Sequence, residues 1–297
     1  MRQLAVLSEN HKTMNLKNFT FIASQYLLPH HLLSRVVGYF AESELVFIKK
    51  PLMNFFLNRF GIDLSEAERE QVNDYKNFND FFTRSLKSEV RTIEGSENEF
   101  VSPVDGAVSQ FGTIHNKALV QAKGRSYRLT DLLGGDTAQA AKFIDGEFAT
   151  LYLSPKDYHR IHMPIAGKLV KTTFVPGKLF SVNQLTAEHV PNLFARNERL
   201  VCEFETERGT VVMVLVGAMI VASIETVWSG IVAPFQRKIS QHLFESRSLD
   251  FERGEEIGRF RLGSTVILLA EKDALHWNDQ IKNGANVKLG QLLQAEE

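Results

Sequence analysis

The chain has 297 residues, 44% of them hydrophobic, which is enough for one large domain or two ordinary ones with a substantial core. Its 34 basic and 35 acidic residues nearly cancel, so the overall charge argues against nucleic acid as a partner. The single cysteine, Cys202, excludes an intramolecular disulfide and a cysteine-based metal site, and it fits a reducing compartment.

Neither a secretory leader nor a membrane-spanning helix is expected. The first 20 residues lack a continuous apolar segment followed by a small-residue cleavage site. The longest apolar run, VVMVLVGAMIVASI at 211–224, falls short of the roughly 20 residues that cross a bilayer, so we interpret it as buried strand. Translation can start at Met1 or at Met14, and the sequence does not decide between them.

A helical pattern runs from about residue 17 to residue 88. Apolar spacing predicts three helices in series, at 19–28, 30–42 and 43–61. Ser65 and Glu68 have the spacing of a capping box and predict a fourth helix over 66–72. The segment NFNDFFTRSL at 77–86 predicts a further helix start.

The helix expected at 44–60 combines large apolar residues with cations. Lys49, Lys50 and Arg59 lie on it, and Arg35 lies on the helix before it. Such a composition is typical of a helix that lies in a membrane interface, although a helix packed on its own domain explains it equally well. Its large apolar residues are Leu45, Phe47, Ile48, Leu52, Phe55, Phe56 and Phe60.

From about residue 99 the helical period fades and short β-branched runs replace it. These runs lie at 106–114, 147–154, 167–176, 200–228 and 264–271, separated by Gly, Asn, Asp and Pro, with a single helix expected at 130–143. Helices followed by strands predict an α+β fold with a mainly antiparallel β core. We therefore expect a helical region at 1–98 and a β-rich core at 99–297.

Three residue types that can form a nucleophilic triad occur in separate segments. His159 and His162 lie three residues apart in SPKDYHRIHMP, Asp105 lies in the turn-like SPVDG, and Ser264 follows Gly263 in RFRLGSTVIL. Each has a plain alternative, since Asp is common in turns and Gly263 can mark a bent strand. The chain has neither a Gly-x-Ser-x-Gly nucleophile elbow nor a His-Glu-x-x-His zinc motif, so no metal is predicted.

The loop VPGKLFSVN at 175–183 offers a cation and backbone donors. Lys178 and the backbone of Gly177 can present these groups to a phosphate, although a surface turn is an equal interpretation.

Six segments together resemble the bacterial phosphatidylserine decarboxylase family, whose members are self-processing proenzymes that use a pyruvoyl cofactor. In family order they are FNDFFTRSL, SPVDG, YLSPKDYHRIHMP, VPGKLFSVN, RGEEIGRF and LGST, spanning about residues 75–270. The resemblance implies that the chain is cut between Gly263 and Ser264 and that Ser264 becomes a covalent pyruvoyl group. It assigns His162 as the base that activates Ser264, with Asp105 orienting it. His159 would then protonate carbon after decarboxylation, while Gly177 and Lys178 would hold the lipid phosphate.

The same resemblance implies the partners and the location. The substrate is phosphatidylserine in a bilayer, and the product is phosphatidylethanolamine. The two cleavage fragments form a heterodimer, with any further dimerisation left open. Because the substrate lies in a membrane, the resemblance favours the interpretation of the helix at 44–60 as a membrane-interface helix. It thus implies that region 1–98 associates with the membrane and that region 99–297 is the catalytic core. The expected location is the cytoplasmic face of the inner membrane.

Overall fold

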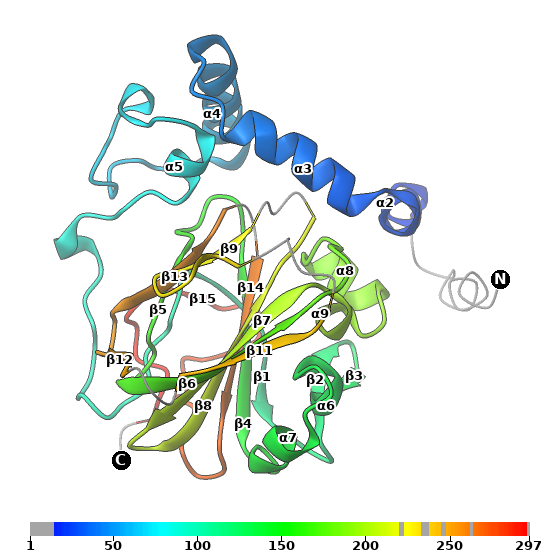
Figure 1. The fold of residues 1–297 in the computed structure, drawn as a ribbon, viewed down its shortest axis with the longest axis vertical. Coiled ribbons are helices and arrows are strands. Elements are labelled where there is room, and N and C mark those ends of the chain that lie inside the picture. The colour runs from blue at the N-terminus through cyan, green and yellow to red at the C-terminus, as the bar shows by residue number, and fades with distance from the viewer. Residues whose placement is uncertain (1–14, 220–222, 233–237, 245–247, 262–263, 296–297) are drawn as a thin grey trace.

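The structure, a computed structural model, describes residues 15–219, 223–232, 238–244, 248–261 and 264–295. Gly263, the residue before the expected cut, lies outside these described residues, so the bend expected at that position stays a prediction. Figure 1 shows a row of helices lying across one end of a large twisted sheet. This arrangement confirms the α+β class and the mainly antiparallel core.

The three helices expected at the start of the chain are present. They are α2 (Leu16–Leu27), α3 (His30–Ala41) and α4 (Val46–Phe60). Asn15 caps α2 by accepting the Asn18 N–H, and Gly61 ends α4 in the left-handed conformation at φ 64°. A short helix, α5 (Phe78–Phe82), is capped by the side chain of Asn77. Helical periodicity was therefore sufficient to locate these elements.

The helix predicted from Ser65 and Glu68 does not form. Its segment is held extended by an isolated bridge between Ala67 and Leu86, and the Glu68 N–H donates to the Ser85 carbonyl. Long-range pairing outweighs the local capping signal here, because buried Ala67 gains its contacts from that bridge. Two short 3₁₀ turns, η1 (Val72–Asp74) and η2 (Ser88–Val90), complete this region.

One nine-stranded antiparallel sheet forms the body of the molecule, in the order β11-β6-β7-β8-β14-β4-β1-β15, with β12 also pairing β6. The bounds are β1 (Gly106–Thr113), β4 (Glu147–Leu153), β6 (Gly167–Val175), β7 (Arg199–Thr206), β8 (Gly209–Val216), β11 (Ser240–Leu243), β12 (Asp250–Phe251), β14 (Ser264–Ala270) and β15 (Asn286–Val287). β14 thus lies inside the sheet, between β8 and β4.

Two smaller sheets accompany the large one. The order of the first is β10-β9-β13-β5, from Gly230–Ile231, Ile224–Thr226, Glu256–Phe260 and Arg160–His162. The second pairs β2 (Ala118–Ala122) with β3 (Arg125–Arg128). The expected helix at 130–143 is divided by Gly134 and Gly135 into α6 (Leu129–Leu132) and α7 (Thr137–Lys142). Two more short helices, α8 (Gln184–His189) and α9 (Leu193–Arg196), follow β6.

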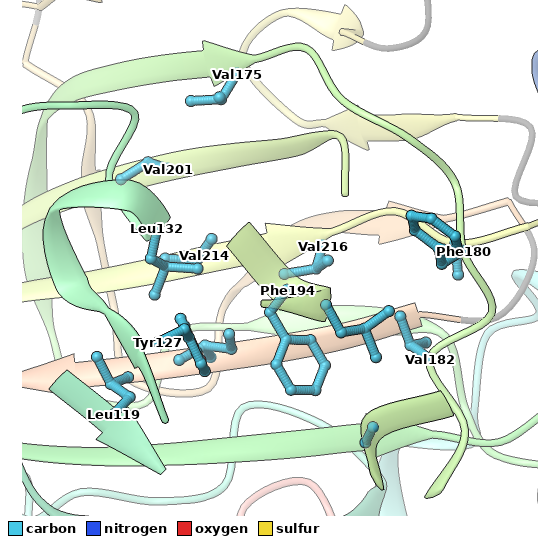
Figure 2. Packing of buried hydrophobic residues seen from close by; sticks show 14 of the residues in the cluster. Leu119, Tyr127, Leu132, Val175, Phe180, Val182, Phe194, Val201, Val214 and Val216 are labelled. Carbon is cyan, nitrogen blue, oxygen red and sulfur yellow. The ribbon is translucent and has the colours of Figure 1, made fainter. Parts of the chain in front are cut away.

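Both faces of the large sheet are buried. Along β14, Val266 and Leu268 belong to one hydrophobic cluster, whereas Ile267 and Leu269 belong to the other. Figure 2 shows the second of these clusters, in which Phe194 and Tyr127 cover strand residues such as Val214. The same cluster contains buried residues of α2 and α4, so the N-terminal helices share a core with the sheet.

The strand directions bring several loops to one edge of the sheet. Val175, Arg199, Val216, Thr265 and Tyr152 form one continuous cross-strand row at that edge. β6, β8 and β4 end there, while β7, β14 and β1 begin there. We call this the site edge, because it gathers Ser264, Asp105 and the loop after β4. The N-terminal helices lie above it in Figure 1.

Candidate active site

Ser264 is the first residue of β14 and lies at the site edge opposite Leu153 of β4. Its side chain is fully buried, and its hydroxyl has no hydrogen-bond partner among the described residues. The hydroxyl of Thr265 is in the same condition. Buried hydroxyls normally find partners, because burying one alone costs about 1–3 kcal/mol. Two adjacent buried hydroxyls without partners make this position the candidate site.

His159 lies on the loop that continues from β4. Its Nδ1 donates to the Asp157 carbonyl at 2.8 Å, so Nε2 carries the lone pair. Burial lowers the pKa of the imidazole to about 3. Nε2 is buried without a partner, and the ring packs on Phe82 at 4.0 Å between centroids. His159 is thus a neutral imidazole whose unused nitrogen is a proton acceptor.

His162 and Asp105 were expected to contact each other, but each is hydrogen-bonded to other residues. His162 Nδ1 donates to the Gly254 carbonyl at 2.8 Å, and the Tyr158 hydroxyl donates to Nε2 at 3.1 Å. Asp105 accepts from Arg91 Nε at 3.0 Å and from the Leu289 N–H at 2.8 Å. The carboxylate therefore does not orient the ring by a direct hydrogen bond, and the Gly254 carbonyl does so instead.

Asp105 still acts on His162 through its charge. Burial lowers the pKa of His162, and the Gly254 hydrogen bond, the Glu256 charge and the Asp105 charge each raise it in part. The structure accordingly brings both residues into one electrostatic environment without joining them. The Asp105 carboxylate accepts hydrogen bonds from Arg91 and from the Leu289 N–H, because these donors lie beside its oxygens. The sequence pattern does not reveal this pairing.

Two charged residues beside the histidines were missed by the sequence analysis. Arg84, within FNDFFTRSL, is buried, and its Nε and Nη1 have no partner among the described residues, while Nη2 donates to the Lys156 carbonyl at 3.0 Å. Asp157 accepts from the N–H and the hydroxyl of Ser154, and burial raises its pKa. Burial is not visible in a local motif, so no sequence signal separated these residues from ordinary surface charges.

Glu198 is a third residue that the sequence did not single out. It precedes β7 at the site edge, is 4% exposed, and its backbone pairs with Gly217 and Lys178. Its side chain has no ion pair with any residue that the structure describes. Burial alone raises the pKa of Glu198 to about 7.

Gly177 and Lys178 lie at the same edge but away from Ser264. Gly177 passes so close to residues 196–198 that a Cβ would lie 2.5 Å from the Arg196 carbonyl oxygen, which explains the glycine. Lys178 is exposed and lines a cleft of about 460 Å³ beside the junction of α2 and α3. Their role in holding the substrate phosphate stays a prediction.

Across the ranges described, no group of three or more His, Cys, Asp or Glu is placed to hold a metal ion. No helix within those ranges is long and apolar enough to cross a membrane.

The site edge thus has the features of an active site: buried hydroxyls without partners, a neutral imidazole and a cap of helices with apolar surface. A family model described as phosphatidylserine decarboxylase matches residues 78–295, and one described as PSD matches residues 20–61. The chain belongs to the phosphatidylserine decarboxylase family.

Similar proteins carry one name, phosphatidylserine decarboxylase proenzyme. The protein of Ectopseudomonas mendocina strain ymp is 51% identical over 281 residues, covering 94% of this chain and 98% of the relative. The protein of Alcanivorax borkumensis is 52% identical over 278 residues, with 93% and 96% covered. The protein of Pseudomonas putida strain KT2440 is 51% identical over 283 residues, with 94% and 99% covered.

Proposed function

We propose that this chain is a proenzyme that cuts itself before Ser264 and then decarboxylates phosphatidylserine to phosphatidylethanolamine. Family membership supports the reaction. The observation that carries the self-processing step is the hydroxyl of Ser264, buried at the start of a central strand with no hydrogen-bond partner among the described residues. A serine kept buried and unpaired is available for chemistry on the chain itself.

The cleavage is an attack of the Ser264 Oγ on the carbonyl of the preceding residue. The hydroxyl proton goes to a base, the peptide C–N bond breaks, and the acyl group moves to oxygen as an ester. Elimination then releases the carboxylate of residue 263 and leaves a dehydroalanine, which water converts to a pyruvoyl group with loss of ammonia. His162 is the base in this proposal: the Gly254 carbonyl fixes its Nε2 as the acceptor, and the Tyr158 hydroxyl that donates to Nε2 gives way to the Ser264 hydroxyl.

A pyruvoyl group at position 264 supplies a ketone that condenses with the substrate amine and takes up the electron pair as CO₂ leaves. His159 then has a defined task. Its Nε2 has no partner among the described residues, and the lowered pKa makes the protonated ring a strong acid, which favours donating a proton to carbon after CO₂ leaves. The proposal therefore keeps His159 as the proton donor to carbon.

Membrane docking belongs to the same proposal. Many of the most exposed large apolar residues lie on or beside α2, α3 and α4, and they include Leu27, Leu32, Val36, Tyr39, Phe40, Leu45, Val46, Phe47 and Phe55. Such an apolar surface is typical of helices that lie in a membrane interface. We place the protein peripherally on the cytoplasmic face of the inner membrane, with its site edge toward the lipid.

Intact mass under denaturing conditions tests the self-processing step. The wild-type preparation should contain two fragments, one ending at residue 263 and one comprising residues 264–297 with a carbonyl-reactive N-terminus. Ser264→Ala should remain one chain and form no phosphatidylethanolamine, while Ser229→Ala, an exposed serine, should be cut normally. An active wild-type preparation that consists of one uncut chain would show that the proposal is wrong.

A further inference from the structure

The cleft beside Lys178 has the composition of an anion site. Its lining contains Lys178 and Arg196 but no Asp or Glu. Neither cation forms an ion pair with any residue in the described ranges. The Arg196 guanidinium lies over the Phe180 ring at 4.6 Å and over the Tyr26 ring at 5.6 Å, so two aromatic rings hold it in place.

Two buried polar atoms in the same cleft lack partners. The Nε2 amide of Gln25 and the Nε2 of His30 have no hydrogen bond within the described part of the chain, although both side chains are at least 95% buried. Burial is the main reason that the pKa of His30 is lowered, and the nearby Lys178 charge adds to it. The Gln25 amide and the two cations without ion pairs are groups that bind an anion, and His30 adds a further donor when its proton lies on Nε2.

The cleft is also joined to α3. His31 Nε2 donates to the Gly177 carbonyl at 3.0 Å, so the first turn of α3 is fixed against this loop. Leu28 and Leu32 line the cleft as well, and both are exposed apolar residues that face the proposed membrane surface. A ligand that joins an anionic group to an apolar chain would therefore place its anion beside the cations and its apolar chain beside Leu28 and Leu32.

The strand order argues against the phosphate of the substrate molecule under attack. β6, which leads to Gly177, lies three strands from β14, and strand spacing of about 4.8 Å puts the two backbones about 14 Å apart. In phosphatidylserine only four bonds separate the phosphorus from the amine nitrogen, which at roughly 1.5 Å a bond span about 5 Å. A phosphate held in this cleft leaves its own amine far from position 264.

We infer that this cleft binds the phosphate of a second, anionic phospholipid of the membrane, which anchors the protein beside its substrate. The inference rests on the proposed membrane docking. In this inference Lys178 and the Gly177 loop bind the phosphate of a second lipid, whereas the sequence analysis assigned them the phosphate of the substrate. Each of the two cations near a charged surface strengthens binding by about fivefold.

Binding of the processed protein to vesicles tests this inference. The probes are phosphatidylcholine vesicles with and without phosphatidylglycerol. Lys178→Gln and Arg196→Gln should each weaken binding to the phosphatidylglycerol vesicles about fivefold and leave binding to pure phosphatidylcholine unchanged. Lys272→Gln is the matched control, because Lys272 is exposed after the far end of β14, at the opposite edge of the sheet.

Two further arms separate a built site from a general charge effect. His30→Phe keeps a ring against Phe180 and changes no charge at neutral pH, yet it should reduce the preference for phosphatidylglycerol. Equal losses in Arg196→Gln and Lys272→Gln would overturn the inference. So would competition by inorganic phosphate as strong as that by phosphatidylglycerol, since the site would then take a free anion.

The substrate's own phosphate remains the rival occupant. If Arg196→Gln raises the KM for detergent-dispersed phosphatidylserine as much as it weakens vesicle binding, the cleft holds the substrate and the inference is wrong. Chain cleavage, read by intact mass in the same variants, reports on the proposed function separately, because the cut needs no lipid.

Discussion

Glu198 and Glu203 are the same residue type, five positions apart, and the fold treats them oppositely. Glu203 is buried on β7 between Lys171 and Lys142, at 2.8 Å from each, and its pKa is lowered by these partners despite burial. Glu198 is buried with no such partner, and its pKa is raised. At the scale of single residues, therefore, the neighbouring charges decide what a buried carboxyl does.

Glu198 should make stability fall as pH rises. Its folded pKa of about 7 lies above that of the unfolded chain, so the folded state binds the proton more tightly between the two values. Stability is full below the unfolded pKa and is lost as pH rises through about 7, by up to about 3 kcal/mol. Chemical denaturation of the uncut Ser264→Ala chain between pH 4.5 and 8 measures this loss.

In that background, Glu198→Gln should remove the loss and stabilise the protein at pH 8. Glu203→Gln is the matched comparison and should destabilise at pH 8 by about 1–3 kcal/mol, because Lys142 loses its ion-pair partner and Lys171 keeps only Asp136. A Glu198→Gln curve that still falls with pH as steeply as its parent would contradict the assignment.

α3 is turned with its apolar side outward. Leu32, Val36, Tyr39 and Phe40 share one face by helical spacing and are all exposed, whereas His30, Ser34 and Ala41 face the protein. The sequence analysis had singled out the next helix. On or beside α4, Leu45, Val46, Phe47 and Phe55 are exposed, whereas Ile48, Leu52, Phe56 and Phe60 are half-buried, and Lys49 donates to the Tyr75 carbonyl at 2.6 Å. The outward stripe of α3 is therefore a second candidate for membrane contact beside the exposed residues of α4.

Substitutions on the α3 stripe should weaken membrane binding without affecting folding. Leu32→Ser should lower vesicle affinity roughly tenfold, because a leucine buried in lipid contributes about 1.5–3 kcal/mol. Its stability in solution should change by less than about 0.5 kcal/mol, since the side chain is already 58% exposed. Leu243→Ser on β11 is 63% exposed and serves as the control, with vesicle affinity expected to stay at the wild-type level. Equal affinities for Leu32→Ser and the wild type would exclude α3 from the membrane contact.

Considered as a whole molecule, the protein builds strands of both expected fragments into one large sheet. β14 starts at Ser264, all seven of its residues are buried, and it pairs β8 and β4 on its two sides. Its side chains enter both hydrophobic clusters. The fragment comprising 264–297 is thus built into the centre of the larger fragment.

The two fragments should therefore stay together after cleavage. Pulling β14 out would expose its apolar side chains on both faces and break two strand pairings, which costs about as much as a typical folding free energy. Native size-exclusion chromatography with mass detection should give one species containing both fragments, and only denaturant should separate them. A small fragment that elutes alone under native conditions would contradict this strand order.

Local patterns in the sequence were sufficient for part of this protein. Apolar spacing located α2, α3 and α4, β-branched runs located the large strands, and the motif around Ser264 pointed to the family. The capping box at Ser65 failed because a distant bridge to Leu86 holds that segment extended. Within the site, the tertiary structure decided that the Gly254 carbonyl, 92 residues along the chain, orients His162, and that α3 faces outward. Hydrogen-bond partners and burial depend on which distant segments the sheet brings together, and the local sequence around a residue does not show which segments those are.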